Sequence, residues 1–360
     1  MRVVVRSELG EVAPAWDEMA AGQDLPSPFL RAWWVSNAAS GAPAVVLCLD
    51  GDRFVGGAAF EVDRVGRGPL GLERVRTLGQ GVLAPDHLDV IAEPGRAPEV
   101  LERVVGWLRR PGNRIVDLDG LAAGGRLATA LAGHELERVG APWTPLPPDP
   151  ATYLAERPGR LRSTIKRTAK RMDKAGARTR MVAPEEADEA LDTLARLHDG
   201  RWADDSEFLG AWQAFRRAAT AGMATGAVVI HEAVDAEGTV IATELDLVTA
   251  GRVAFYQAGR STDHDWRGAG SVLKADVIHW AIESGCTEYD LLRGDESYKS
   301  DWAAQRRELL RVRFGVGTAG QVVAAGADAW RRALPLVQRS TERWRALRHP
   351  AGPGATSPPT

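Results

Sequence analysis

The sequence predicts an α/β (α+β) protein built from two similar domains in tandem, each a mixed, mostly antiparallel sheet flanked by helices. The chain has 360 residues, which is long for one ordinary domain and comfortable for two. Its halves repeat one order of predicted helices and strands, and such internal similarity is typical of a duplication. Between the halves, the stretch APWTPLPPDP (141–150) holds five prolines, which predict a stiff connection.

The similarity between the halves is weak in residue identity but consistent in order. PFLRAWW begins at Pro28 and EFLGAWQ at Glu207, and each predicts a helix, a β-branched strand (45–49 and 228–232), a turn and a second strand. Farther on, VVGWLRRPGNRIVDLDG resembles VIHWAIESGCTEYDLLRG. Two pairs of residues in these segments are each 173 positions apart: Trp107 and Trp280, and Asp117 and Asp290. Chance similarity between two α/β halves is the alternative to a duplication.

The elements of the second half follow from local signals. Apolar, β-branched runs bounded by turns predict the strands, and Pro184 with the two glutamates after it predicts a helix start. The predicted strands are 178–183, 226–234, 239–248, 252–260, 287–293 and 307–315. The predicted helices are 185–200, 207–222, 268–284 and a short one at 296–304.

These elements divide the chain into four segments. We expect an N-terminal domain at 1–145, a C-terminal domain at 146–320 and a C-terminal helix at 321–348. The tail at 349–360 reads PAGPGATSPPT from Pro350 on and is rich in proline and glycine, so we expect it to be disordered.

Composition excludes several classes of function. The formal net charge of −3 gives no overall bias toward nucleic acid or membrane. Two cysteines, one in each half, provide neither a disulfide framework nor a zinc site, and the histidines form no metal-binding pattern, so we expect no metal. The N-terminus lacks the apolar core of a signal peptide, and no stretch has the roughly 20 apolar residues of a membrane span. A soluble, cytoplasmic protein is the expectation.

One segment departs strongly from this neutral balance. Residues 157–180 carry ten lysines or arginines against one acid, Asp173. They predict a helix whose i, i+4 stripe is Arg162, Lys166, Lys170 and Lys174. The stripe is either a solvated helix face or a binding surface for a nucleotide, an acidic acceptor or an RNA backbone.

Two short motifs carry chemistry. Arg267-Gly268-Ala269-Gly270 lies between a predicted strand and a predicted helix, where glycines let a backbone approach a ligand and helix N–H groups favour a pyrophosphate. A tight turn with a helix cap is the alternative. The second motif, YDLLRGDESYKSDW (289–302), runs from a buried strand into a cluster of acids, a tyrosine and a lysine.

The order β-α-α-β-β-β-loop-α-β-α-β over 178–315 resembles the GCN5-related N-acetyltransferase (GNAT) fold. With its tandem halves and the segments WRGAGSVLKADVIHWAIESG and YDLLRGDESYKSDW, the chain resembles the BioF2-like or CelD-like tandem acetyltransferases, which are related to Fem-type aminoacyltransferases. The resemblance implies acetyl-CoA or another acyl-CoA as donor and a small-molecule amine as acceptor. It departs from the usual phosphate loop at Asp265, where an acid would repel phosphate.

The resemblance also implies site residues. Acyl transfer to an amine requires a deprotonated amine, a polarised carbonyl and a protonated leaving thiolate. The resemblance places Tyr298 as general acid, and Glu296 or Asp295 as acceptor of the amine proton; a packed tyrosine and helix-capping acids are the alternatives. Donor-binding residues would be Arg267, Gly268, Ala269, Gly270, Tyr256 and Gln257. Acceptor-binding residues would be Lys166, Arg167, Arg293, Lys299, Glu244 and Asp246.

The first half lacks both motifs, so we expect it to be a degenerate copy that forms one wall of the acceptor cleft. The function expected is acyl-CoA-dependent N-acyl transfer, acetyl transfer in the first instance, to a small molecule. Two alternatives stay open: a Fem-type ligase that uses aminoacyl-tRNA, and a non-catalytic binding module, which Asp265 favours. A tRNA partner belongs only to the first of these, and the chain is expected to be a monomer or a homodimer.

Overall fold

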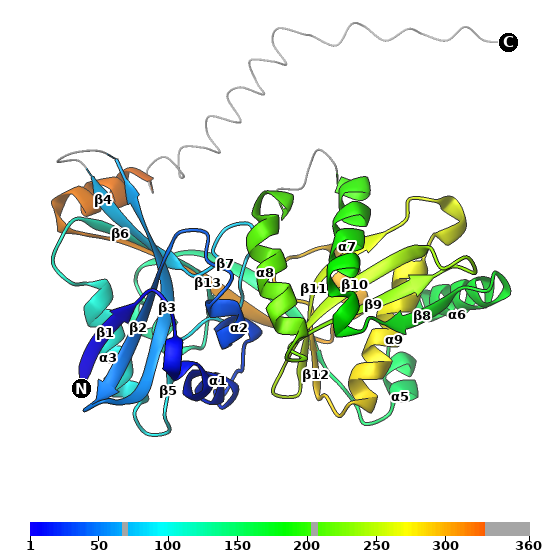
Figure 1. Cartoon of the computed structure of the whole chain (residues 1–360), viewed down its shortest axis with the longest axis horizontal. Coiled ribbons are helices and arrows are strands. Elements are labelled where there is room, and N and C mark those ends of the chain that lie inside the picture. The colour runs from blue at the N-terminus through cyan, green and yellow to red at the C-terminus, as the bar shows by residue number, and fades with distance from the viewer. Residues whose placement is uncertain (67–70, 203–207, 328–360) are drawn as a thin grey trace, which may run out of the picture.

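The computed structural model describes residues 1–66, 71–202 and 208–327, with the side chains of 199–202 and 209 left out. Within these residues the strands form one sheet of thirteen strands that runs through both halves of the chain (Figure 1). Its order is β1-β2-β3-β4-β6-β13-β7-β12-β11-β10-β9-β8, with β5 paired to β3 beside this path. The fold is therefore mixed α/β, as the sequence predicts.

The N-terminal half supplies the first strands of this sheet and short helices beside them. Its elements are β1 (Arg2–Arg6), η1 (Gly10–Val12), α1 (Ala13–Ala21), η2 (Pro28–Leu30), α2 (Ala32–Val35), β2 (Ala42–Asp50), β3 (Arg53–Val65), β4 (Leu72–Thr77), β5 (Ile91–Ala92), α3 (Ala97–Leu108), β6 (Arg114–Ala122), α4 (Arg126–Ala130) and β7 (Glu135–Pro145).

The C-terminal half follows the predicted order closely. Its elements are α5 (Pro150–Ala155), α6 (Gly159–Lys174), β8 (Arg178–Met181), η4 (Pro184–Glu186), α7 (Ala187–Trp202), η5 (Phe208–Ala211), α8 (Trp212–Met223), β9 (Val228–Val234), β10 (Val240–Thr249), β11 (Arg252–Arg260), η6 (His264–Trp266), α9 (Ala269–Glu283), β12 (Glu288–Asp290), η7 (Ser297–Asp301) and β13 (Gln305–Val316). A helix then covers 317–327. The rest of the predicted helix 321–348 and the tail lie outside the described residues.

The two halves exchange their last strands. In each half the fourth long strand pairs in parallel with the next one, β4 with β6 and β11 with β12. An independent half would then add its own last strand beside that pair. Instead β13 pairs with β6, and β7 pairs with β12, while β7 and β13 pair with each other. The topology of the halves repeats, with β7 and β13 crossed over at the centre.

This exchange changes the meaning of the predicted domain boundary. The sequence assigns 307–315 to the domain 146–320, because the strand follows that domain's other elements in the chain. In the structure this strand, β13, lies between two strands of the first half. Residues 1–145 and 146–320 therefore share their central strands and are not separable as sheets.

Helices cover both faces of the C-terminal part of the sheet. On one face, α7 and α8 pack over β9, β10 and β11 and belong to a core cluster that continues into the first half through Trp34 and Phe29. On the other face, α9 and α6 close a second cluster around Val277 and Ile278. The α8 helix also contacts α2, where a Cβ on Gly222 would lie 3.1 Å from the Trp33 ring.

The strand exchange predicts that neither half folds alone. In a fragment 1–145, β6 would lose its neighbour β13, and β7 would lose both of its neighbours, β12 and β13. Exposed strand edges of this kind promote aggregation. We expect fragments 1–145 and 146–327 to be insoluble when expressed separately and to form one soluble complex when co-expressed, as judged by size-exclusion chromatography and circular dichroism. As a control, cleavage at an inserted protease site between Pro147 and Pro148 after folding should leave the complex intact. A monomeric 1–145 fragment that unfolds cooperatively would contradict this prediction.

Candidate active site

A cavity forms where β11 and β12 separate. These parallel strands are paired only from Arg252 to Ala254, opposite Glu288 to Asp290. Leu292 then has a φ of 54°, which breaks the strand, and the backbone N–H groups of Leu291 and Gly294 donate to β7, at Pro142 O (2.8 Å) and Gly140 O (3.0 Å). The chain therefore follows β7 and leaves β11, as expected for a splayed pair. The predicted strand 287–293 is accordingly shorter, ending at Asp290.

The cavity has a volume of about 1000 Å³ and reaches both faces of the sheet. Its lining comes from β10, β11, α9, the 291–302 segment and the N-terminal-half loop 82–86. Cross-strand register separates the two faces. Thr243 pairs with Gly259, so both face the same side of the sheet, and a Cβ on Gly259 would lie 2.7 Å from Leu197 of α7. The next residue, Glu244, faces the other side and contacts Lys274 of α9. We call these the α7 face and the α9 face.

The N-terminus of α9 borders the α9 face. Gly268 caps the helix with a φ of 93°, a conformation that favours glycine. Gly270 lines the cavity, and a Cβ there would meet no atom within 4 Å. Within the described residues, no hydrogen bond or ion pair engages the side chain of Arg260, which also lines the cavity. Its cross-strand partner Ala242 packs with α9, so Arg260 is on the same face and provides a cation beside the helix N-terminus.

The other predicted loop residues lie outside the cavity lining. Ala269 is buried as the first residue of α9, and the side chain of Arg267 is exposed while its carbonyl accepts a hydrogen bond from Arg171. Asp265 is exposed in η6 and is absent from the lining. The acid that departs from the usual phosphate loop therefore does not face the cavity.

The pairing of β10 with β11 contains a register shift at the cavity. Leu245 of β10 pairs with Gln257 and Asp246 pairs with Phe255, so Tyr256 has no cross-strand partner. The Tyr256 hydroxyl donates to Leu83 O (2.8 Å), and burial raises the pKa of this phenol above its usual range. Tyr256 thus lines the cavity as a structural residue with its hydroxyl engaged, and Gln257 lines it beside the shift.

Glu244 and Asp246 belong to a buried polar network on the α9 face. Lys274 Nζ lies 2.8 Å from Glu244 Oε1, and the Tyr289 hydroxyl lies 2.7 Å from the same oxygen and 3.1 Å from Asp246 Oδ1. Burial, and then the neighbouring Glu244, raise the pKa of Asp246 well above its usual value. Glu244 and Lys274 line the cavity, whereas Asp246 is fully buried behind them.

Lys274 was missed by the sequence analysis. It is one of only five lysines in the chain, and it stands between apolar residues in the segment SVLKADV. A lysine on the apolar side of a helix needs a buried partner, and this was the available signal.

The three predicted catalytic residues lie on or next to η7. Tyr298 lines the cavity and is 40% exposed. Glu296 also lines it and forms an ion pair with Lys299 (3.0 Å). Asp295 instead forms an exposed ion pair with Arg306 (2.8 Å) and is absent from the lining. Of the two acids, Glu296 is therefore the one at the cavity.

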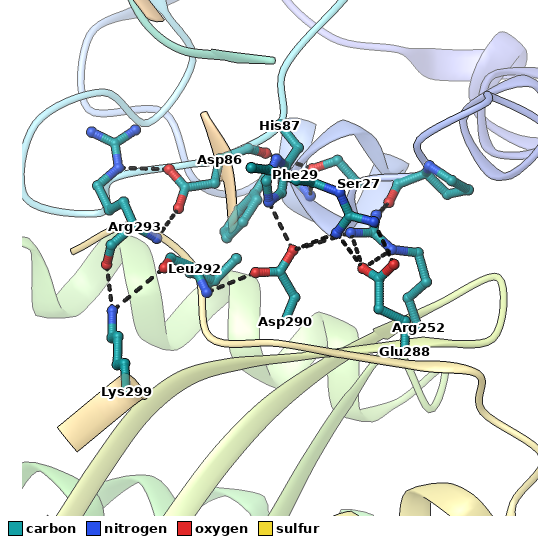
Figure 2. Close-up of polar contacts among 12 residues, drawn as sticks. Ser27, Phe29, Asp86, His87, Arg252, Glu288, Asp290, Leu292, Arg293 and Lys299 are labelled. Atoms are coloured by element: carbon teal, nitrogen blue, oxygen red, sulfur yellow. Dashed lines mark hydrogen bonds and ion pairs between the residues drawn. The ribbon is translucent and has the colours of Figure 1, made fainter. Parts of the chain in front are cut away.

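Arg293 and Lys299, predicted to hold an acceptor, are engaged within the protein. The Arg293 guanidinium donates to Asp86 (2.5 Å; Figure 2). It also donates to Asp119 (2.9 Å) and to the carbonyl of Pro85 (3.0 Å), and all three acceptors are in the first half. Lys299 is buried and donates to the carbonyls of Leu292 and Arg293. Both side chains line the cavity, and these contacts pair their charges within the cavity wall.

Asp290 is the centre of a second buried cluster at the junction of the halves (Figure 2). Its Oδ2 lies 2.8 Å from His87 Nε2 and 3.1 Å from Arg252, which also pairs with Glu288 (2.6 Å) and donates to the carbonyl of Pro26. Burial alone would raise the pKa of Asp290, but His87 and Arg252 hold it below its usual value. The charges of the YDLLRG segment thus join the C-terminal half to the first half.

The basic helix α6 packs against α9, close to the cavity mouth. Leu161 lines the cavity, and Thr168 lies against Gly268. Lys166 and Arg167 are exposed and do not line the cavity. The exposed cations of α6 therefore form a basic surface beside the N-terminus of α9.

Comparisons with known proteins agree with this geometry. Residues 159–300 match the family described as an acetyltransferase (GNAT) domain. The part of the chain that surrounds the cavity, from α6 into η7, is therefore similar to a GNAT acetyltransferase domain. No curated protein matches its sequence.

Solved structures show the same fold over most of the chain. FemX matches with a TM-score of 0.60 and 11% identity, over 86% of this chain and 97% of FemX. A protein of unknown function from Bacteroides thetaiotaomicron matches with a TM-score of 0.55 and 11% identity, over 86% of this chain and 99% of that one. The L-PGS of Bacillus licheniformis matches with a TM-score of 0.53 and 13% identity, over 84% of this chain and 91% of that one.

Among the described residues, no group of three or more His, Cys, Asp or Glu side chains is arranged to hold a metal ion. In the same part of the chain no helix combines the length and the apolar character that crossing a bilayer requires.

The Asp290 cluster predicts a pH-dependent stability. The pKa of Asp290 in the folded state lies below its usual value of 3.8. The ionised carboxylate therefore stabilises the fold at and above pH 3.8, and this stabilisation is lost as the pH falls through the folded-state pKa. Asp290→Asn should lower the free energy of unfolding by about 3 kcal/mol at pH 7, because it leaves buried cations unpaired, and the gap to wild type should narrow below pH of about 4. Urea unfolding at several pH values measures both.

The matched control is Asp295→Asn, which removes an exposed ion pair with Arg306 and should change stability by less than about 1 kcal/mol. A gap between wild type and Asp290→Asn that stays constant from pH 3 to pH 7 would contradict the assignment.

Proposed function

We propose that this protein is an acyl-CoA-dependent N-acyltransferase, an N-acetyltransferase in the first instance, that acts on an amine of a small molecule. The observation that supports this most directly is the cavity at the divergence of β11 and β12, with Gly270 and Arg260 beside the N-terminus of α9. Together these features suit a ligand with an extended arm and an anionic end.

The donor fits the cavity in two places. Free N–H groups of the first turn of α9, with Arg260 beside them, would hold the pyrophosphate of CoA. Beyond Ala254, no strand of the described residues pairs with β11 on the β12 side, so its backbone groups there are available to hydrogen-bond an extended chain with amide groups, as in β-strand addition. The pantetheine arm is such a chain. Gln257 and the register shift at Tyr256 lie farther along the same strand, where the thioester would come to rest.

The reaction then needs one proton donor and one proton acceptor. The amine nitrogen attacks the thioester carbonyl carbon, a C–N bond forms, the C–S bond breaks, and the nitrogen loses a proton. In our proposal Tyr298 gives its phenolic proton to the leaving thiolate, and Glu296, directly or through water, takes the proton from nitrogen. Both side chains line the cavity. The two transfers balance, and proton exchange with solvent restores Tyr298 and Glu296.

A Fem-type reaction with aminoacyl-tRNA as donor is the second candidate. The fold shared with FemX and the exposed cations of α6, including Lys166 and Arg167, favour it. The cavity has the same place in both proposals, so they differ in the ligand that the basic surface meets. A binding module without catalysis is the third candidate, although Asp265, which motivated it, lies outside the cavity lining.

A thermal-shift titration with CoA, acetyl-CoA and longer acyl-CoAs, with tRNA in parallel, tests the donor. A ligand that binds the folded state raises the melting temperature according to its concentration over Kd. We expect a shift with acetyl-CoA and none with tRNA. A shift with tRNA alone would favour the Fem-type reaction, and no shift with either ligand would overturn both.

Gly270→Leu should abolish the shift with acetyl-CoA without lowering the melting temperature of the free protein. The new side chain would fill the open space where the donor is expected, and Gly270 has an ordinary helical conformation. Gly268 is unsuitable for this test, because its φ is 93° and a Cβ at that position would lie 2.9 Å from the Thr168 hydroxyl oxygen, so any variant would be destabilised. An unchanged acetyl-CoA affinity in Gly270→Leu would contradict the donor site.

Tyr298→Phe should lower kcat by roughly 10²-fold with little change in donor affinity, because general acid catalysis typically contributes that much. Steady-state kinetics with acetyl-CoA, followed by thiol release, measure the effect. Tyr153→Phe is the control: it removes a tyrosine hydroxyl that donates to Trp302 O (3.0 Å) behind the cavity, so it should alter stability more than kcat. Unchanged turnover in Tyr298→Phe would show that another group protonates the thiolate.

A further inference from the structure

The α7 face of the cavity contains a buried hydroxyl without a partner. Thr243 is 1% exposed and lines the cavity, and its Oγ1 has no hydrogen-bond partner among the described residues. Leaving such a group unpaired costs about 1–3 kcal/mol. Buried polar groups in native proteins are almost always paired, so an unpaired hydroxyl at a cavity wall is a place where a bound molecule can supply the partner.

The wall around Thr243 is apolar and aromatic. Leu83 from the first half, Phe208 and Tyr256 line it, and Tyr256 stacks on Phe215 behind it with ring centroids 5.5 Å apart. The Tyr256 hydroxyl is already used by Leu83 O, so this wall presents the ring and not the phenol group. Flat apolar groups pack well against such walls.

Charge is distributed unevenly between the two faces. The α9 face has Arg260 and the Lys274–Glu244 pair, whereas the acid on the α7 face, Asp86, is taken up by two hydrogen bonds from Arg293. Among the described lining residues that β10, β11, α7 and η5 place on this face, none is Lys, Arg, Asp or Glu, and His198 of α7 is the group there that can carry a positive charge. A phosphate or carboxylate placed there would lose its hydration and meet no lysine or arginine from these elements.

We infer that the acceptor is a primary amine on an uncharged, mainly apolar or aromatic body that carries one hydrogen-bonding group, and that Thr243 Oγ1 recognises this group. The inference rests on the proposed function, since it assigns the α7 face to the acceptor and the α9 face to the donor. A site that hydrogen-bonds a substrate group discriminates against the analogue that lacks it, because the buried partner is then left unsatisfied. Thr243 is thus a specificity-determining residue.

The test compares amines with acetyl-CoA as donor, following thiol release by the full chain. Tyramine and phenethylamine differ by one hydroxyl; phosphoethanolamine, glucosamine 6-phosphate and spermidine represent anionic and polycationic acceptors. We expect the highest kcat/KM for an aromatic amine, and tyramine preferred over phenethylamine by about 10-fold or more. A preference for a phosphorylated or polycationic amine would overturn the inference, as would turnover of none of the five amines by a protein that binds acetyl-CoA.

Thr243→Val separates specificity from structure. Valine has nearly the same shape without the hydroxyl, so the preference for tyramine should collapse while phenethylamine turnover and acetyl-CoA affinity stay unchanged. Thr249→Val is the control for loss of a buried hydroxyl elsewhere on the strand: Thr249 is 3% exposed and outside the cavity lining, and its Oγ1 accepts a hydrogen bond from Arg31 (3.2 Å). An unchanged preference in Thr243→Val would remove Thr243 from the acceptor site. A failure of acetyl-CoA to bind would instead refute the proposed function, and this inference with it.

Discussion

The divergence of β11 and β12 after Asp290 is the constraint on which the rest of the structure depends. A parallel pair normally continues as far as both strands remain extended, but here Asp290 is held by Arg252 on β11 and by His87 of the first half. The next backbone N–H group, that of Leu291, is taken by β7. His87 and β7, both from the first half, thus hold the chain away from β11 after Asp290. The cavity lies in the opening that results. The strand exchange supplies β7 at that place, so the site exists only because the two halves share one sheet.

Much of this could be predicted from sequence because it depends on local pattern. The strand β11 has the predicted bounds 252–260, and α9 begins at Ala269, one residue after the predicted start at 268. The strand exchange could not be predicted, because the propensity of 305–316 for a strand does not reveal its neighbour. Pairs such as Arg293 with Asp86 connect residues 207 positions apart, and no local signal joins them. In the sequence Arg293 therefore resembles a charge available to a ligand, whereas in the structure its guanidinium is paired with Asp86.

The two faces of the cavity differ in how they satisfy polar groups. On the α9 face the Tyr289 hydroxyl joins Glu244 to Asp246, and Lys274 completes the set, so the charges compensate one another close to a region suited to phosphate. On the α7 face the main polar group without such a partner is the Thr243 hydroxyl. A donor with a charged end and an acceptor with a neutral body would each meet the environment that solvates it better. Under the proposed function, this asymmetry of charge would set the direction in which the two substrates enter.

The first half contributes a wall that is rigid for a physical reason. Ala84 and His87 have φ values of 42° and 57°, which non-glycine residues adopt at a cost of about 1–3 kcal/mol each. The contacts of Asp86 with Arg293 and of His87 with Asp290 offset that cost, so the loop is held by the same residues that end β12. The side chains of Val82 to Ala84 also line the cavity but make none of these contacts, so they can change without breaking them. Under the proposed function, changes at these residues of the first half would alter the choice of acceptor while the donor side stays intact.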